Sequence, residues 1–156
     1  MRFAVSEGMI KLAREKSVRV EDIMTRDLII LEMATKVSVA AAILSERRIS
    51  GAPVVSRTGA PVGVITRTDL LDPRHQGPDA TVEQAMTRVI YAVRPTDSAM
   101  AAVRLMVAEK LHRVVVVEQS GRICGIVTSM DVMRSLAKGS ADDDEIAVEY
   151  IKLAKT

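Results

Sequence analysis

The chain has 156 residues, and its 22 basic side chains nearly balance its 20 acidic ones, which gives no general attraction to nucleic acid or anionic lipid. One cysteine and two histidines exclude a framework of disulfides within the chain and the usual Cys/His zinc sites. No apolar run approaches the roughly 20 residues of a membrane-spanning helix, and residues 1–16 lack the pattern of an export signal. We therefore expect a globular, cytoplasmic protein.

An internal repeat organises the chain. Residues 20–26 (VEDIMTR) return as 82–88 (VEQAMTR), and residues 63–69 (GVITRTD) return as 125–131 (GIVTSMD), both with an offset of 62 residues. The intervening residues align at the same offset without a gap. Two copies of one supersecondary unit are the simplest interpretation.

Each copy contains the same predicted order of strand, helix, strand, strand and helix. Short aliphatic runs predict buried strands, apolar residues at i, i+3 and i+4 predict helices packed on a sheet, and glycine in a short polar connection predicts a hairpin. In the first copy the predicted strands are 28–31, 52–56 and 61–65, with helices capped by Thr35 and Thr66, the second ended by Pro73. In the second copy they are 89–93, 114–118 and 123–127, with helices capped by Asp97 and Thr128. The last helix is expected to end near Gly139.

The expected domain organisation follows from the repeat. It comprises an N-terminal helix (1–17), a first repeat (18–72), a Pro- and Gly-containing linker (73–80), a second repeat (81–139) and a C-terminal helix (140–156). The acidic run at 142–145 is interpreted as a solvated helix start rather than a metal site, because consecutive carboxylates on a helix point in different directions.

Taken together, these motifs resemble the cystathionine-beta-synthase (CBS) domain family, whose members occur as tandem pairs. The resemblance covers roughly residues 20–139. Its motifs are the openings DIMT (22–25) and QAMT (84–87), the segments ISGAPVV (49–55) and LHRVVVV (111–117), and the two Gly-x-x-Thr-x-x-Asp stretches. It implies an α+β fold in which two pseudo-symmetric β-α-β-β-α repeats pack sheet to sheet, and it implies a homodimer.

The resemblance also implies a cleft between the repeats that binds an adenosine nucleotide (AMP, ADP, ATP or a related adenosyl compound). Asp69 and Asp131 would accept hydrogen bonds from the ribose hydroxyls, and Thr66 and Thr128 would reach ribose or phosphate beside free helix-start amides. The strand residues that would line the adenine pocket are Gly51, Ala52, Pro53, Arg113, Val114 and Val115. The candidates for phosphate neutralisation are Arg67, His112 and Arg113.

Structural alternatives exist for the same residues. Thr66 and Thr128 can simply cap helices, with Asp69 and Asp131 closing capping boxes, and a duplicated fold duplicates its caps as well as its sites. We expect a stand-alone regulatory protein with no catalytic activity, no obligatory cofactor and no metal site of its own, although Mg²⁺ could accompany the phosphates. Ligand binding would shift the conformation and signal to a target protein. The main rival function is a ligand-free module for dimerisation or docking to a partner; an enzyme is disfavoured because no P-loop or nucleophile–base arrangement is seen.

Overall fold

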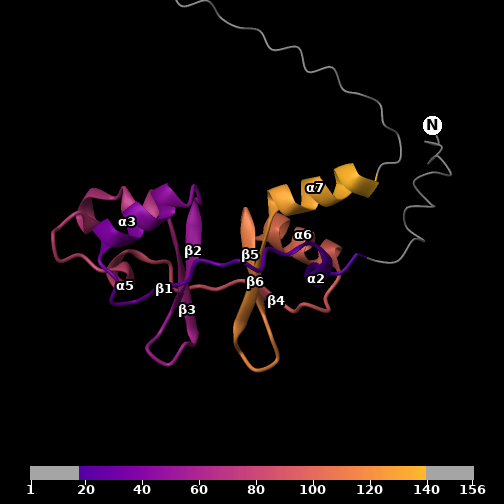
Figure 1. Cartoon of the computed structure of the whole chain (residues 1–156), viewed down its shortest axis with the longest axis horizontal. Helices are drawn as coiled ribbons and strands as arrows, with labels where there is room; N and C mark the ends of the chain where they lie inside the picture. Colours follow the sequence, from indigo (N-terminus) through magenta and orange to yellow (C-terminus); the bar gives the residue numbers. More distant parts are fainter. Residues whose placement is uncertain (1–17, 140–156) are drawn as a thin grey trace, which may run out of the picture.

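The computed structural model describes residues 18–139, which form two similar lobes side by side (Figure 1). The helices expected at 1–17 and 140–156 lie outside the described residues. Within 18–139, no helix combines the length and apolar character needed to cross a bilayer.

Each lobe is built on one three-stranded sheet. In the first lobe the strand order is β1 (Leu31–Glu32), β2 (Gly51–Val55) and β3 (Pro61–Thr66), and in the second it is β4 (Ala92–Val93), β5 (Arg113–Val117) and β6 (Ile123–Thr128). In both sheets the short first strand pairs in parallel with the middle strand, and the last two strands form an antiparallel hairpin. The predicted α+β repeats are confirmed.

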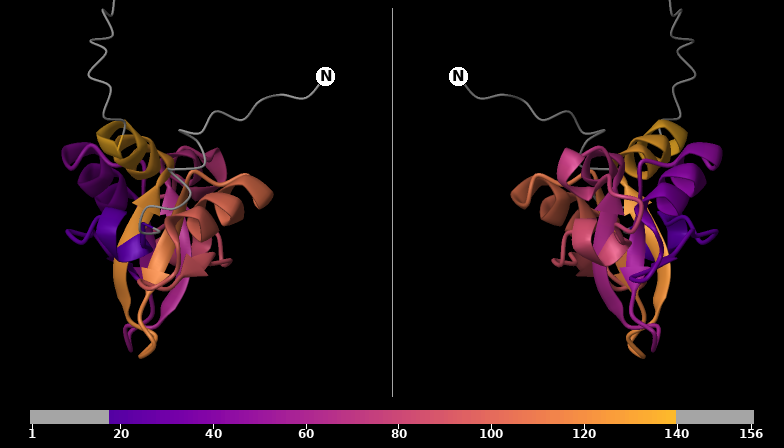
Figure 2. Two further views of the ribbon diagram at one scale, coloured as in Figure 1. Left: turned by 90° about the vertical axis from the view of Figure 1, so that its right-hand side faces the viewer. Right: turned by 90° about the vertical axis from the view of Figure 1, so that its left-hand side faces the viewer.

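Two helices of each repeat cover its sheet. They are α3 (Val37–Glu46) and α4 (Arg67–Leu70) in the first lobe, and α6 (Ala99–Ala108) and α7 (Ser129–Gly139) in the second. A 3₁₀ turn, η1 (Pro73–His75), follows α4, since proline cannot continue the α-helix. Viewed end on, the helices gather at one end of the molecule and the hairpin turns lie at the other (Figure 2).

The two hairpin turns depend on glycine. Gly59 and Gly121 have φ angles of 81° and 87°, in the left-handed region that glycine enters without a steric penalty. Both turns were predicted from their glycine-containing connections.

The two predicted caps of the middle helices are wrong. The residue before α3 is Lys36, which makes no side-chain cap, and the residue before α6 is Ser98, whose hydroxyl accepts a hydrogen bond from the Ala101 amide. Thr35 instead belongs to the turn that leaves β1, and the Asp97 carboxylate accepts the Arg94 amide one turn earlier. Thr35 and Asp97 therefore lie in the turns that precede α3 and α6, and each helix begins after them.

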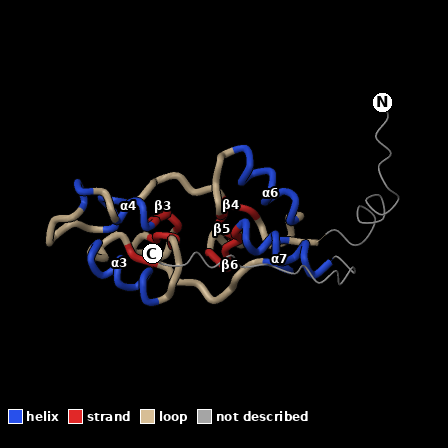
Figure 3. The backbone as a smooth tube through the Cα atoms, turned by 90° about the horizontal axis from the view of Figure 1, so that it is seen from above, coloured by secondary structure: helices blue, strands red, loops and turns tan. Residues whose placement is uncertain are grey.

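The repeats exchange their opening helices. The helix α2 (Val20–Ile23) opens the first repeat, yet Val20 is fully buried in the core of the second lobe. In the same way α5 (Val82–Ala85) opens the second repeat and places Val82 in the core of the first lobe. Seen from above, loops run between the lobes on both sides (Figure 3). Each hydrophobic core is therefore completed by the other sequence repeat.

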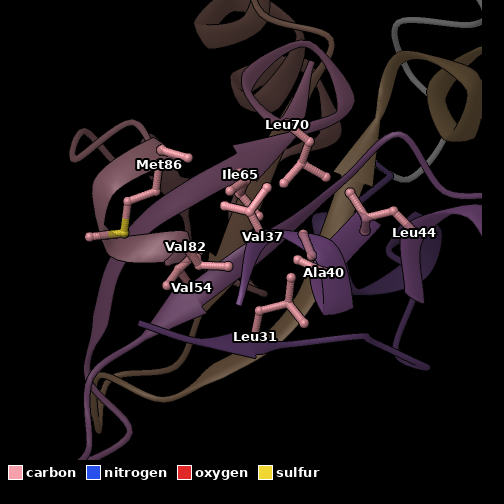
Figure 4. Packing of buried hydrophobic residues seen from close by; sticks show 11 residues of the cluster. Leu31, Val37, Ala40, Leu44, Val54, Ile65, Leu70, Val82 and Met86 are labelled. Atoms are coloured by element: carbon pink, nitrogen blue, oxygen red, sulfur yellow. The ribbon is translucent and has the colours of Figure 1, made fainter. Parts of the chain in front are cut away.

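Branched aliphatic side chains fill the cores. Leu44 of α3, Val54 of β2 and Ile65 of β3 are fully buried in the first lobe, and Val82 and Met86 from the exchanged segment close the same cluster (Figure 4). Burying each of these side chains contributes about 1.5–3 kcal/mol. This packing holds the ends of β2 and β3 where the two lobes meet.

Candidate functional site

Two cavities lie where the lobes meet. Cavity A, of about 360 Å³, is lined by the end of β3 with the start of α4 and by residues of the segments 87–91 and 110–115. Cavity B, of about 230 Å³, is lined by residues of the segments 25–29 and 48–53 together with two residues of β6. Both cavities thus receive residues from both repeats.

The two cavities are related by the repeat. Cavity A contains Thr87, Lys110 and His112 where cavity B contains Thr25, Arg48 and Ser50, each pair separated by the offset of 62 residues. Their positions are therefore equivalent, while several of their side chains differ.

Backbone hydrogen bonds between the two sequence repeats fix the wall of each cavity. In cavity A, Val64 and Thr87 exchange two N–H to O=C bonds of 3.0 and 2.9 Å. In cavity B, Thr25 and Ile126 do the same at 2.9 and 3.0 Å. None of these four was predicted as a site residue, although the Met-Thr pair repeated in the two openings was an available signal.

The Thr-x-x-Asp motifs form capping boxes in both repeats. The Asp69 carboxylate accepts the Thr66 amide and hydroxyl, both at 2.8 Å, and the Asp131 carboxylate accepts those of Thr128, both at 2.9 Å. The structural alternative for these residues is therefore realised. Neither aspartate lines its neighbouring cavity, whereas Thr66 lines cavity A and Thr128 lines cavity B.

The two aspartates differ in whether one carboxylate oxygen remains without a hydrogen bond. The second oxygen of Asp131 accepts a hydrogen bond of 3.0 Å from Arg134, and the residue is 8% exposed. The second oxygen of Asp69, which is half-buried, has no hydrogen-bond partner among residues 18–139. Within residues 18–139, the Asp69 carboxylate thus has one oxygen without a hydrogen bond, whereas both oxygens of Asp131 already accept at least one.

The expected free amides at the helix starts are largely occupied. The amides of Thr66 and Asp69 bond within the capping box, and the Arg67 amide donates to the Ser50 carbonyl at 3.0 Å. In the second repeat the Ser129 amide likewise donates to the His112 carbonyl. The chain itself therefore satisfies most of these amide donors, which leaves the basic side chains as the main candidates for holding an anion.

Arg113 lies between the two cavities and lines both. Its guanidinium donates to the Ser50 hydroxyl and to the Gly51 carbonyl, the latter at 3.5 Å. Burial lowers the pKa of this half-buried guanidinium, and no carboxylate within residues 18–139 forms an ion pair with it. A partly desolvated cation without a counter-ion is costly unless an anion joins it.

The remaining predicted residues divide between the cavities and the cores. Arg67, His112 and Val115 line cavity A, with Arg67 also donating to the Leu44 carbonyl at 3.3 Å, and Gly51 and Pro53 line cavity B. Ala52 and Val114 are buried in the cores of their own lobes. Alternation along a strand explains this split, since neighbouring side chains point to opposite faces.

Tyr91 adds a polar group to cavity A. A hydrogen bond to the Glu109 carboxylate, with a smaller effect of burial, raises the pKa of its phenol, so the ring stays neutral at physiological pH.

Elsewhere, a larger groove of about 520 Å³ lies between α3, α4 and the 75–78 connection. Of the predicted site residues only Arg67 lines that groove, so cavities A and B remain the candidates.

No three His, Cys, Asp or Glu side chains of residues 18–139 gather in a way that could hold a metal ion.

A family model named "CBS domain" matches residues 20–74 and 82–138. The chain therefore belongs to the CBS domain family and carries two copies of the domain. CBS pairs are regulatory modules and not catalytic domains.

Solved structures of CBS pairs share the fold. One is CBSX2 in complex with AMP, 28% identical with a TM-score of 0.70 over 78% of this chain and 97% of that chain. Another is the CBS domain pair of protein MJ0100 in complex with 5'-methylthioadenosine and S-adenosylmethionine, 28% identical with a TM-score of 0.71 over 79% of this chain and 98% of that chain.

Among curated relatives, the chain is 30% identical over 76% of its length to the A-adding tRNA nucleotidyltransferase of Aquifex aeolicus. It is 26% identical over 78% of its length to 5'-AMP-activated protein kinase subunit gamma-3 of Sus scrofa. The chain spans only 14% and 26% of these two relatives.

Proposed function

We propose that this CBS pair is a cytoplasmic regulatory protein without catalytic activity that binds an adenosine nucleotide at the junction of its repeats. The ligand is AMP, ADP, ATP or a related adenosyl compound, with Mg²⁺ as a possible companion of the phosphates. The observation that carries the proposal is Arg113, a half-buried guanidinium with no counter-ion in the described chain, lying between two cavities. Bound AMP and adenosyl ligands in similar CBS pairs support it.

In this proposal, different residues in and beside the two cavities contact the phosphate, the base and the ribose. The cation of Arg113, with Arg67 and His112, neutralises phosphate, and the strand residues around Gly51 and Val115 contact the base. The free oxygen of Asp69 accepts a ribose hydroxyl after a small rearrangement of the α4 start, because Asp69 does not line cavity A directly.

The structure also supports a way to transmit the signal. Each lobe contains the opening helix of the other repeat, and the backbone bridges at Val64 and Ile126 bond each lobe to the segment that crosses from the other repeat beside the cavities. A ligand that binds one arrangement of the lobes more tightly than another shifts the population toward that arrangement. A target protein would detect this shift.

Exposed apolar side chains favour self-association. Val107 of α6 and Leu136 of α7 are 73% and 63% exposed, with Met130 and Met133 also exposed beside them on α7. We propose that these helices pair with a second copy of the chain in a homodimer. A ligand-free dimerisation or docking module would use the same surface, and nucleotide binding separates the two functions.

Thermal unfolding with AMP, ADP, ATP, S-adenosylmethionine and GTP tests the proposal. A ligand at 100 times its dissociation constant stabilises the protein by about 2.7 kcal/mol, which moves the midpoint by several degrees. Arg113→Gln should abolish the shift. The matched control is Arg122→Gln, which removes an exposed arginine on the β5–β6 turn that lines neither cavity. No shift with any adenosine compound would refute the nucleotide function.

The role of Asp69 requires a substitution that spares the helix cap. Asp69→Asn keeps an oxygen that can accept the Thr66 amide but removes the charge of the carboxylate, whereas Asp69→Ala would remove the cap as well. If Asp69 binds ribose, Asp69→Asn should weaken AMP binding with little change in the unfolding midpoint of the free protein.

A further inference from the structure

The two cavities differ in charge. Cavity A is lined by the basic side chains of Arg67, Lys110, His112 and Arg113, and no acidic residue of 18–139 lines it. Cavity B is lined by Arg48, the shared Arg113 and the carboxylate of Asp27. Residues at equivalent repeat positions have thus diverged: the position of Asp27 in cavity B is occupied by Val89 in cavity A.

The cavities also differ in size, and Arg113 contributes to the difference. Its equivalent in the first repeat is Gly51, whose backbone lies so close that an added Cβ would be 3.0 Å from the Arg113 guanidinium and 2.8 Å from the Ile65 carbonyl oxygen. Glycine at 51 therefore makes room for the arginine of the other repeat. Cavity B is left at about 230 Å³, smaller than cavity A at about 360 Å³, so it has less room for phosphates beside a nucleoside.

We infer that the two cavities take adenosyl ligands of different charge: cavity A a phosphorylated nucleotide, and cavity B a nucleoside without phosphate. The inference rests on the proposed function, because it assigns ligands to the same junction. Phosphates in cavity A are attracted by Lys110, Arg67 and Arg113 together, whereas phosphates in cavity B would face the carboxylate of Asp27.

The ribose side of each cavity agrees with this assignment. Next to cavity A, Asp69 keeps one oxygen without a partner in the described chain, so a nucleotide there can be held at both sugar and phosphate. Next to cavity B, Asp131 is already held by Arg134, an ion pair that the first repeat lacks because Asp72 occupies the equivalent position. Cavity B thus offers fewer polar anchors and favours a ligand bound mainly through its base.

Lys110 and Arg48 provide a matched pair of test positions. They are equivalent in the repeat, both exposed, and both in the left-handed backbone region, with φ angles of 55° and 54°. Asparagine tolerates that conformation well, so Lys110→Asn and Arg48→Asn each remove one charge without straining the turn. One change falls in cavity A and the other in cavity B.

The test is calorimetric titration of the full chain with ATP, then of the ATP-saturated chain with adenosine. We expect one equivalent of ATP, followed by a further equivalent of adenosine that does not release the ATP. Lys110→Asn should raise the dissociation constant for ATP about tenfold, the usual loss for a charge-assisted contact. It should leave the dissociation constant for adenosine within about twofold. Arg48→Asn should leave the dissociation constant for ATP within about twofold of the wild-type value.

Four results would overturn the inference or its basis in distinguishable ways. Displacement of ATP by adenosine at a single site, or two equivalents of ATP in the wild-type chain, would remove the assignment of different ligands and leave the nucleotide function standing. Equal weakening of ATP binding by the two variants would also remove the assignment of different ligands. Binding of neither ATP nor adenosine would remove the proposed function itself.

Discussion

Two equivalent glycines, Gly63 and Gly125, give the sharpest test of how the lobes are joined. Both lie in the last strand of their sheets, opposite the segment that crosses from the other repeat. A Cβ at 63 would lie 2.5 Å from the carbonyl oxygen of Thr87 and 3.0 Å from the sulfur of Met86. A Cβ at 125 would meet only side-chain atoms of Met24, with the sulfur at 2.5 Å, Cγ at 3.1 Å and Cβ at 3.3 Å.

The cost of Gly63→Ala can be worked out from these contacts. Relieving the clash requires the Thr87 backbone to move, and this breaks its two hydrogen bonds with Val64, worth about 1 kcal/mol each. With about 1 kcal/mol of overpacking, the total is about 3 kcal/mol. Gly125→Ala should cost only about 1 kcal/mol, because the Met24 side chain can adopt another rotamer. The gain from a less flexible unfolded chain is common to both variants and cancels in the comparison.

Urea unfolding followed by circular dichroism measures the difference. We expect Gly63→Ala to lower the free energy of unfolding by about 2 kcal/mol more than Gly125→Ala. Since Thr87 and Val64 line cavity A, Gly63→Ala should also weaken nucleotide binding there. Equal losses of stability in the two variants would refute the argument, because it depends on the contrast between a backbone neighbour and a side-chain neighbour.

Other predictions concern individual contacts. Ser98→Ala removes the side-chain cap of α6 and should cost about 1 kcal/mol in urea unfolding, and Ser98→Asp should restore it. Hydrogen bonds from Arg74 hold the pKa of the Asp72 carboxyl well below its usual range, so its small contribution to stability should be present above about pH 4 and disappear as the pH falls further. A carboxyl NMR titration should show that pKa rising toward its ordinary value in Arg74→Gln; an unchanged value would contradict the pairing. Burial raises the pKa of the Cys124 thiol, so its alkylation near pH 8 should be slower in the folded protein than in urea.

Much of the fold could be predicted from the sequence because each lobe repeats local signals. Glycine in a polar connection predicted both hairpins, and short runs of aliphatic residues predicted the strands. The first strand of each sheet was predicted too long, since the aliphatic run from 28 to 31 pairs with β2 only from Leu31 onward. Residues before it leave the sheet, and Thr25 pairs with Ile126 in the other lobe instead.

The exchange of opening helices could not be predicted in the same way. An apolar residue such as Val20 indicates that one face of its helix is buried, but its identity does not say which lobe buries it. Both repeats present nearly the same surface, and the choice depends on the path of the connecting segments. Long-range pairing, and not local propensity, decides such a choice.

Equivalent positions that differ between the repeats are more informative about ligands than those that agree. Thr66 and Asp69 recur in the second repeat, but the capping boxes explain that recurrence without any ligand. By contrast, no cap or core requires arginine at 113 where the first repeat has glycine, or a carboxylate at Asp27 where the second has valine. Close packing against the Ile65 carbonyl explains the glycine at 51, but it does not explain the arginine at 113 or the carboxylate at 27. The differences converge on the two cavities and alter their charge and volume, and this is the effect expected if the cavities hold different ligands.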